Sequence, residues 1–201
     1  MDNLAFENKD IQYAYRSIHD FFDLYHLGSA IKETEKIIKA AARHKAWLTK
    51  EPYRPIYFME KLYGLIHAAY MVTKNYSART ACILKEPVNG HPNLLLTQNY
   101  VSIYQACTPW NNMPRHLTAA QYHDPYIAIE KFIKYATEID WKEACKDLAE
   151  YALTNDSIDE EYPGYKLLPI RLHILRLIEA CHLLEVRINA AQPKLKTVKK
   201  K

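Results

Sequence analysis

Leu65-Ile-His-Ala-Ala-Tyr-Met-Val72 has a counterpart 112 positions later, in Leu177-Ile-Glu-Ala-Cys-His-Leu-Leu184. An earlier pair, Tyr15-Arg-Ser-Ile-His-Asp-Phe21 and Tyr126-Ile-Ala-Ile-Glu-Lys-Phe132, aligns at an offset of 111. Seven of 40 aligned positions are identical, and the order and spacing of the segments agree as well. We interpret the pattern as an internal duplication of one three-helix unit. Convergent patterning of unrelated amphipathic helices is the alternative.

Hydrophobic residues recur at steps of three and four in each copy, which predicts three helices per copy and an all-α fold. Gly28 fits the C-terminal cap of the first helix, and Ser29 fits the N-terminal cap of the second. Pro55 suits the first turn of the third helix. The predicted helices span about 8–27, 29–49, 55–72, 126–137, 141–155 and 169–188.

We expect one globular helical domain, in which the two units pack through their apolar faces about an approximate two-fold axis. Residues 75–124 match neither copy, and four prolines punctuate them. Within this central segment the pattern predicts helices at Thr97–Ala106 and near Leu117–Tyr122, and we expect the segment to cover the junction. The other parts are repeat 1 at about 8–74, repeat 2 at about 125–188 and a basic tail at 192–201.

Composition narrows the class of protein. The chain has 201 residues, 49% hydrophobic and 25% charged, and its four glycines disfavour a β-sandwich or a glycine-rich nucleotide loop. The formal charge of +4 comes from five lysines in the last ten residues, because 22 basic and 23 acidic residues remain without them. The nearly neutral charge of the chain without this tail gives little support to nucleic-acid binding. Four cysteines without a C-x-x-C pair, no signal peptide and no apolar stretch of about 20 residues predict a cytoplasmic protein with no membrane partner.

Five residues are candidate metal ligands. His19, Asp23 and His26 share one helix face at positions i, i+4 and i+7, and imidazole and carboxylate groups suit zinc or iron. The last helix adds Glu179-Ala-Cys-His182, which has the E-x-x-H step of di-iron bundles. At the positions aligned with His19, Asp23 and His26, the second copy has glutamate, lysine and threonine. The repeat therefore argues against a metal site, and we expect no cofactor.

Arg176 and His182 have the Arg-x5-His spacing of helical ribonucleases of the HEPN type, and in this respect the last helix resembles that family. In the family the two side chains lie on one helix and attack RNA at a dimer interface, which implies the same catalytic role here. Leu177 departs from the pattern, because a polar residue normally follows the arginine. The alternative makes Arg176 a surface cation and His182 an interface side chain.

A basic ridge of about three turns lies on one face of the second predicted helix, formed by Lys32, Lys36, Lys39 and Arg43. Such a ridge suits the phosphates of a nucleic acid. The aligned positions in the second copy are mostly acidic: Glu143, Asp147, Glu150 and Thr154. Complementary ridges would pair within or between molecules. Two separately solvated helix faces are the alternative.

Two aromatic-rich segments, Phe21–Leu27 and Tyr57–Tyr70, resemble those of small helical proteins of Bacteroidetes-type bacteria, for which no activity is established. The resemblance implies no site residues. We therefore expect a cytoplasmic helical interaction or scaffold protein, more a binding protein than an enzyme, with a protein partner or self-association. The alternatives are a nucleic-acid-binding or HEPN-like ribonuclease protein and a metal-dependent helical-bundle enzyme.

Overall fold

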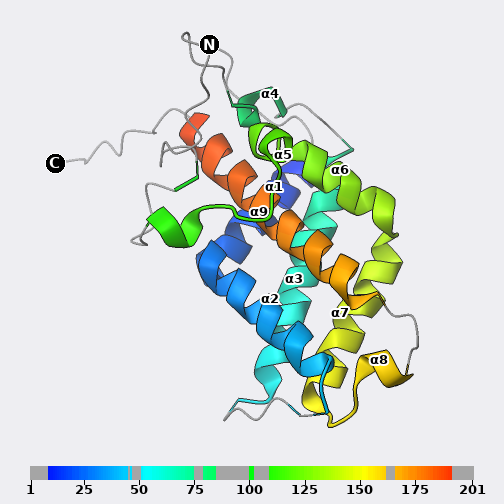
Figure 1. The fold of residues 1–201 in the computed structure, drawn as a ribbon. Coiled ribbons are helices and arrows are strands. Elements are labelled where there is room, and N and C mark those ends of the chain that lie inside the picture. The colour runs from blue at the N-terminus through cyan, green and yellow to red at the C-terminus, as the bar shows by residue number, and fades with distance from the viewer. Residues whose placement is uncertain are drawn as a thin grey trace, which may run out of the picture.

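The computed structural model describes residues 9–44, 46, 51–74, 79–84, 100–101, 109–161 and 166–191. Their regular structure is helical and includes no strand, which confirms the all-α fold class (Figure 1). None of the helices in these ranges is both long enough and apolar enough to cross a bilayer. In chain order the elements are α1 (Lys9–Leu24), α2 (Leu27–Ala41), α3 (Tyr53–Val72), α4 (Arg79–Cys82), the 3-10 helix η2 (Pro109–Asn112), α5 (Ala119–His123), α6 (Tyr126–Tyr135), α7 (Glu138–Leu153), α8 (Ile158–Glu161) and α9 (Leu167–Ala191).

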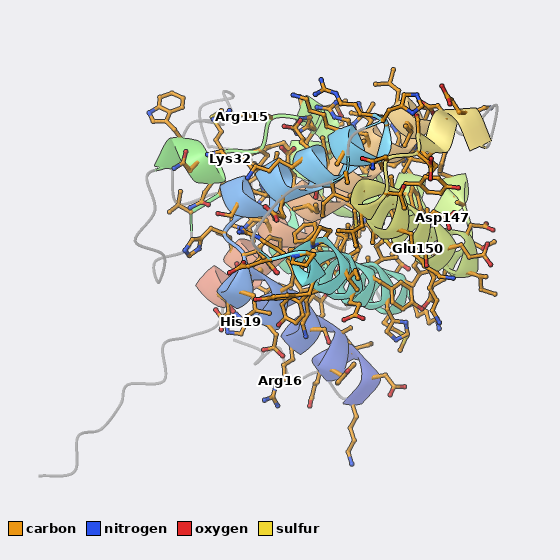
Figure 2. All side chains as sticks on the ribbon, turned by 90° about the horizontal axis from the view of Figure 1, so that it is seen from below. Arg16, His19, Lys32, Arg115, Asp147 and Glu150 are labelled. Atoms are coloured by element: carbon orange, nitrogen blue, oxygen red, sulfur yellow. The ribbon has the colours of Figure 1, made fainter. Side chains whose placement is uncertain are left out.

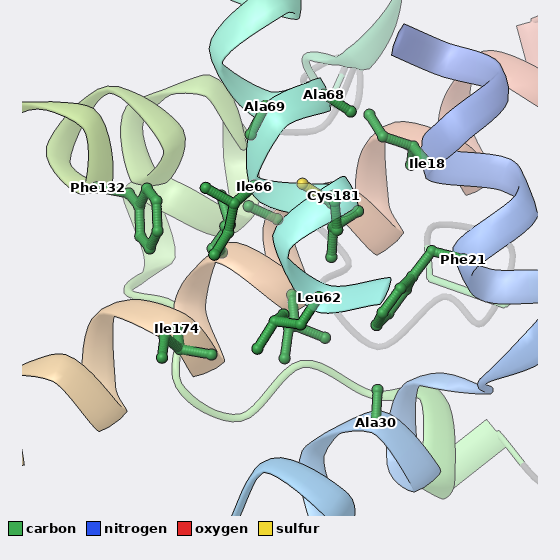
Figure 3. Packing of buried hydrophobic residues seen from close by; sticks show 14 of the residues in the cluster. Ile18, Phe21, Ala30, Leu62, Ile66, Ala68, Ala69, Phe132, Ile174 and Cys181 are labelled. Carbon is green, nitrogen blue, oxygen red and sulfur yellow. The ribbon is translucent and has the colours of Figure 1, made fainter. Parts of the chain in front are cut away.

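Helix α3 packs against both α1 and α7, while α9 packs against α2 and α6. One hydrophobic cluster takes side chains from all six of these helices. Figure 3 shows Leu62 and Ile66 of α3 between Phe21 of α1 and Phe132 of α6. Phe132 also stacks on Trp141 of α7 at a centroid distance of 4.1 Å, an arrangement that contributes about 1 kcal/mol beyond the burial of the rings. The first and last thirds of the chain therefore share one interior.

The helix pairs of the first third recur in the last third. α1 packs against α3 as α6 packs against α9, and α3 packs against α7 as α9 packs against α2. All seven identical positions are buried in both copies, apart from the half-buried Tyr15. The aligned residues Tyr15 and Tyr126 have their hydroxyls 2.6 Å apart, as equivalent residues do near a two-fold axis. These features agree with a duplication, but shared patterning also explains the burial, so the repeat stays a prediction.

Two predicted helix caps are wrong. α2 begins at Leu27, so Gly28 and Ser29 both lie in its first turn instead of ending one helix and starting the next. A Cβ atom on Gly28 would lie only 2.8 Å from the backbone oxygen of Asn111. Gly28 is therefore suited to the close approach of η2 to α2 and not to a helix end.

The start of α7 also differs from the prediction. It begins at Glu138, three residues early, because Thr137 and Asp140 form a capping box around its first turn. A second capping box, at Thr118, starts α5 close to the predicted position. The predicted helix at 97–106 falls mostly outside the described residues, and the basic tail falls wholly outside them.

Candidate functional site

Polar side chains of α9 hold the central segment in place. We call them the α9 polar stripe, which consists of Arg176, Glu179, His182 and Arg187. Glu179 is fully buried, and its carboxylate accepts the backbone N–H groups of Arg115, His116 and Leu117 at 2.7, 2.8 and 3.1 Å. The Nδ1 atom of His116 lies 2.8 Å from the same carboxylate. Both oxygens of Glu179 are thus engaged in fixing the loop that precedes α5.

The candidate ribonuclease pair contacts backbone carbonyls of the same segment. Arg176 donates through Nε to the carbonyl of His116 at 3.0 Å. His182 is fully buried, and its Nε2 donates to the carbonyl of Tyr100 at 2.9 Å, because a carbonyl oxygen can only accept. Desolvation lowers the pKa of His182 to about 4, so the imidazole is neutral at physiological pH. In the described structure His182 is therefore not accessible to RNA.

The last member of the stripe, Arg187, was missed by sequence reasoning. Its guanidinium donates to the carbonyls of Cys82, Tyr122 and His123 at 2.8, 2.8 and 3.2 Å. It also lies over the Tyr122 ring, 5.1 Å from the centroid. The one signal in the sequence is an arginine placed between apolar neighbours in a long helix, a position where a buried cation must find acceptors.

The five candidate metal ligands do not converge. On α1, Nε2 of His19 lies 3.4 Å from Asp23, while Nδ1 lies 3.4 Å from Glu185, a residue that sequence reasoning did not consider. His26 is exposed at the N-terminal cap of α2. The two candidates on α9 are committed to the central segment. Among the residues that the structure describes, no group of three such side chains is arranged so that it could hold a metal ion.

Lys32, Lys36 and Lys39 of the basic ridge are exposed along α2, and the acidic residues aligned with the ridge lie on α7. Arg43 is exposed in the turn that follows, because α2 ends at Ala41 and not near residue 49 as predicted. Burial, and then the neighbouring carboxylates of Glu150 and Glu143, raise the pKa of Asp147, as expected for acids without a nearby cluster of cations. Although α2 and α7 pack together, no ion pair joins the two ridges within the described ranges. Figure 2 shows Lys32 well apart from Asp147 and Glu150. The basic ridge therefore faces solvent.

A groove of about 610 Å³ runs between α3 and α7. Met59, Cys145 and Ala149 form a buried apolar floor. Burial raises the pKa of the Cys145 thiol to about 12, so the floor carries no charge. Ile56 and Ile139 also line the groove, although they are 44% and 70% exposed. The charged residues that line it are Glu60, Lys142, Glu143, Lys146 and Glu150.

Sequence reasoning missed this α3/α7 groove because it depends on two helices far apart in the chain. The local sequence gives little sign of the groove. Ile56 lies off the predicted apolar stripe of its helix, and Ile139 precedes the predicted start of the helix at 141–155. Isolated apolar residues of this kind are common on protein surfaces. They become a site only when the fold places them along one groove.

No family model matches the chain, and neither does any curated protein or any solved structure. The resemblances drawn from the two aromatic segments and from the Arg-x5-His spacing therefore stay predictions. The choice among candidate sites rests on exposure, shape and hydrogen bonding.

Proposed function

We propose that this protein is a non-enzymatic helical interaction protein, which receives an amphipathic helix of a protein partner in the α3/α7 groove. The observation that carries the proposal is the exposure of Ile56 and Ile139 beside a buried apolar floor. An apolar depression rimmed by charge is typical of a surface that a partner covers.

The shape of the groove favours a helix as its occupant. The residues of α7 that line it run from Ile139 to Glu150, about 16 Å along the helix axis, which matches three turns of a partner helix. Two packed helices expose a groove into which a third fits its apolar stripe. The rim carries both signs of charge, so it would select a partner with charged flanks in a matching order.

The opposite pair of helices supplies a precedent. If the repeat is correct, α9 and α2 correspond to α3 and α7. There the chain's own segment covers one end of the helix pair, because η2 packs against α2 and Glu179 of α9 holds residues 115–117, whereas Leu168, the counterpart of Ile56, stays exposed. We propose that a partner covers the α3/α7 groove in a similar way, and over more of its length.

A non-enzymatic role is supported by the way in which the candidate catalytic side chains are used. Arg176, Glu179 and His182 each bind backbone atoms of the central segment, which is a structural task. We propose the cytoplasm as the compartment, in keeping with free, buried thiols at Cys82, Cys145 and Cys181.

The test compares the variant Ile139→Lys with the matched control Leu168→Lys. Leu168 of α9 is 73% exposed and Ile139 is 70% exposed, so both variants place one lysine at an exposed apolar position. Leu168 does not line the α3/α7 groove. Partners would be captured by cross-linking in the source organism, and the helix that makes contact would be synthesised and titrated by fluorescence anisotropy. We expect Ile139→Lys to weaken binding at least tenfold and Leu168→Lys to change it less than twofold.

Two results would contradict the proposal. Equal affinity of the wild-type protein and Ile139→Lys for the captured helix would exclude the groove. A homodimer in sedimentation that Ile139→Lys dissociates would identify a second copy of the chain, and not a separate partner, as the occupant.

A further inference from the structure

A second depression, independent of the α3/α7 groove, lies between α1 and α9. Its volume is about 260 Å³, roughly that of eight or nine water molecules in the liquid. Tyr15 and His19 of α1 line one side, and Glu185, Ile188 and Asn189 of α9 line the other. The side chain of Glu185 is only 5% exposed, so this α1/α9 pocket brings a buried carboxylate to an opening at the surface.

The carboxylate of Glu185 is short of hydrogen-bond donors. Its Oε1 atom receives the side-chain N–H of Asn189 at 3.2 Å and faces Nδ1 of His19 at 3.4 Å. Its Oε2 atom is buried and has no hydrogen-bond partner. Nδ1 of His182 lies 4.0 Å from Oε2 and is also buried without a partner. Because Nε2 of His182 carries the proton donated to Tyr100, Nδ1 is an acceptor.

The charges around Glu185 leave its carboxylate poorly compensated. On α1, His19 is half exposed and is shared with Asp23, whose own carboxylate repels that of Glu185. Arg16 lines the pocket but is exposed and forms no ion pair with Glu185. On α9, His182 is neutral. A buried carboxylate in such surroundings is unfavourable, and burial raises the pKa of Glu185.

We propose that the α1/α9 pocket binds a small primary amine as its ammonium ion, with Glu185 as the recognising carboxylate. The ammonium would donate to the carboxylate of Glu185, which lines the pocket and has one oxygen without a hydrogen-bond partner. A hydroxyl brings one proton to this position, whereas an ammonium brings three and a positive charge. Ile188 and the ring of Tyr15 give a short alkyl chain an apolar wall. Any proton that Glu185 holds in the free pocket passes to solvent when the ammonium binds.

Isothermal titration calorimetry of the full chain with n-butylamine tests the site, with 1-butanol and butyrate as probes of the same length. We expect n-butylamine to bind and the other two to show no measurable binding. The amine stays protonated well below its own pKa, and burial raises the pKa of Glu185, so the affinity should rise with pH as Glu185 ionises, by at most about tenfold per unit. Equal binding of butanol would overturn the proposal, since it would show an apolar cavity only.

Variants assign the binding to the carboxylate. Glu185→Gln keeps the size of the side chain, and we expect it to weaken n-butylamine binding at least tenfold. The control Asp20→Asn removes an exposed acid of α1 that does not line the pocket, and it should change binding less than threefold. Ile139→Lys should also leave amine binding unchanged, which separates this site from the α3/α7 groove. Equal binding by Glu185→Gln and the wild-type protein would refute the assignment.

A measurement on the unmodified chain guards against a variant that fails to fold. In 13C-labelled protein, the side-chain carboxyl resonance of Glu185 reports its titration directly. Saturating n-butylamine should lower the pKa of Glu185, because the ammonium favours the ionised form. A titration curve that does not move when the amine is added would overturn the proposal independently of any substitution.

Discussion

Burial determines the role of His182 more than its residue type does. Histidine and arginine six positions apart on a helix suit catalysis when both reach substrate. Here the imidazole is fully buried, and its proton is held by a backbone carbonyl. The same spacing therefore serves to anchor another part of the chain. Sequence spacing indicates which residues share a helix face, but not whether that face meets water or protein.

The buried imidazole should make the protein sensitive to acid. The pKa of His182 is lowered from 6.5 to about 4, so its contribution to stability is complete above pH 6.5 and is lost as pH falls through 4. Over that interval the loss amounts to about 3 kcal/mol. The variant His182→Gln keeps a donor for Tyr100 but does not titrate. In urea unfolding at pH 7 to 4, we expect its free energy of unfolding to fall by about 3 kcal/mol less than that of the wild-type protein.

Glu185 acts in the opposite direction over the same pH range. Its pKa is raised, so it contributes stability at low pH that is lost as pH rises above the ordinary range of a glutamate. Both proteins contain Glu185, and the double variant that also carries Glu185→Gln separates its contribution from that of His182. Parallel stability curves for wild type and His182→Gln would contradict the prediction.

At the scale of elements, the contact between η2 and the start of α2 shows what local patterns miss. Gly28 followed by Ser29 is a typical boundary between helices, yet α2 begins before both. The glycine is needed because Asn111, far along the chain, lies against it. Nothing within one helical turn of Gly28 records that neighbour, so a reading of local sequence assigns the glycine to the wrong task.

A pair of glycine substitutions tests this explanation. Gly28→Ala places a methyl group 2.8 Å from the backbone oxygen of Asn111, and we expect a loss of about 1–3 kcal/mol. Gly64→Ala lies inside α3 with nothing within 4 Å of the new atom, so helix propensity alone should stabilise it by about 0.5–1 kcal/mol. The measurement is chemical denaturation of both variants. Changes of the same sign would show that the approach of η2 imposes no requirement for glycine.

The helices themselves were largely predictable because hydrophobic periodicity is local. Six of the predicted helices correspond to α1, α2, α3, α6, α7 and α9. Even the early start of α7 was readable, since Thr137 precedes Asp140 at the spacing of a capping box. The buried Arg187, the Glu185 pocket and the α3/α7 groove were not predictable, because each depends on contacts between segments more than 50 positions apart.

At the scale of the whole molecule, the helices interlock instead of forming two separate units. α2 packs mainly against α7 and α9, although it belongs to the same third of the chain as α1 and α3. α3 packs against α7 in the same way. Each third therefore buries part of its apolar surface only in the presence of the other, which makes independent folding of one third unfavourable.

We therefore expect the protein to unfold in a single cooperative step. Differential scanning calorimetry should give a calorimetric enthalpy equal to the van't Hoff enthalpy. The variant Phe21→Ala, which removes a buried side chain from α1, should lower the free energy of unfolding by about 3–5 kcal/mol. Hydrogen exchange should then show the same loss of protection at Leu148 of α7 as at Ile18 of α1. Two resolved transitions, or a loss confined to α1, would indicate separate folding units.

The α9 polar stripe also bears on how freely the chain can vary. Arg176, His182 and Arg187 grip carbonyl oxygens, and Glu179 grips amide hydrogens, so the stripe recognises the path of the central segment more than its composition. The side chain of His116 also contacts Glu179, Leu117 packs against the hydrophobic core, and the Tyr122 ring lies under Arg187. Mutational drift should therefore accumulate at the other positions of the segment, while these three residues and the stripe stay constant. A protein designer could therefore replace the outward-facing side chains of the central segment without losing the hydrogen bonds that hold it to α9.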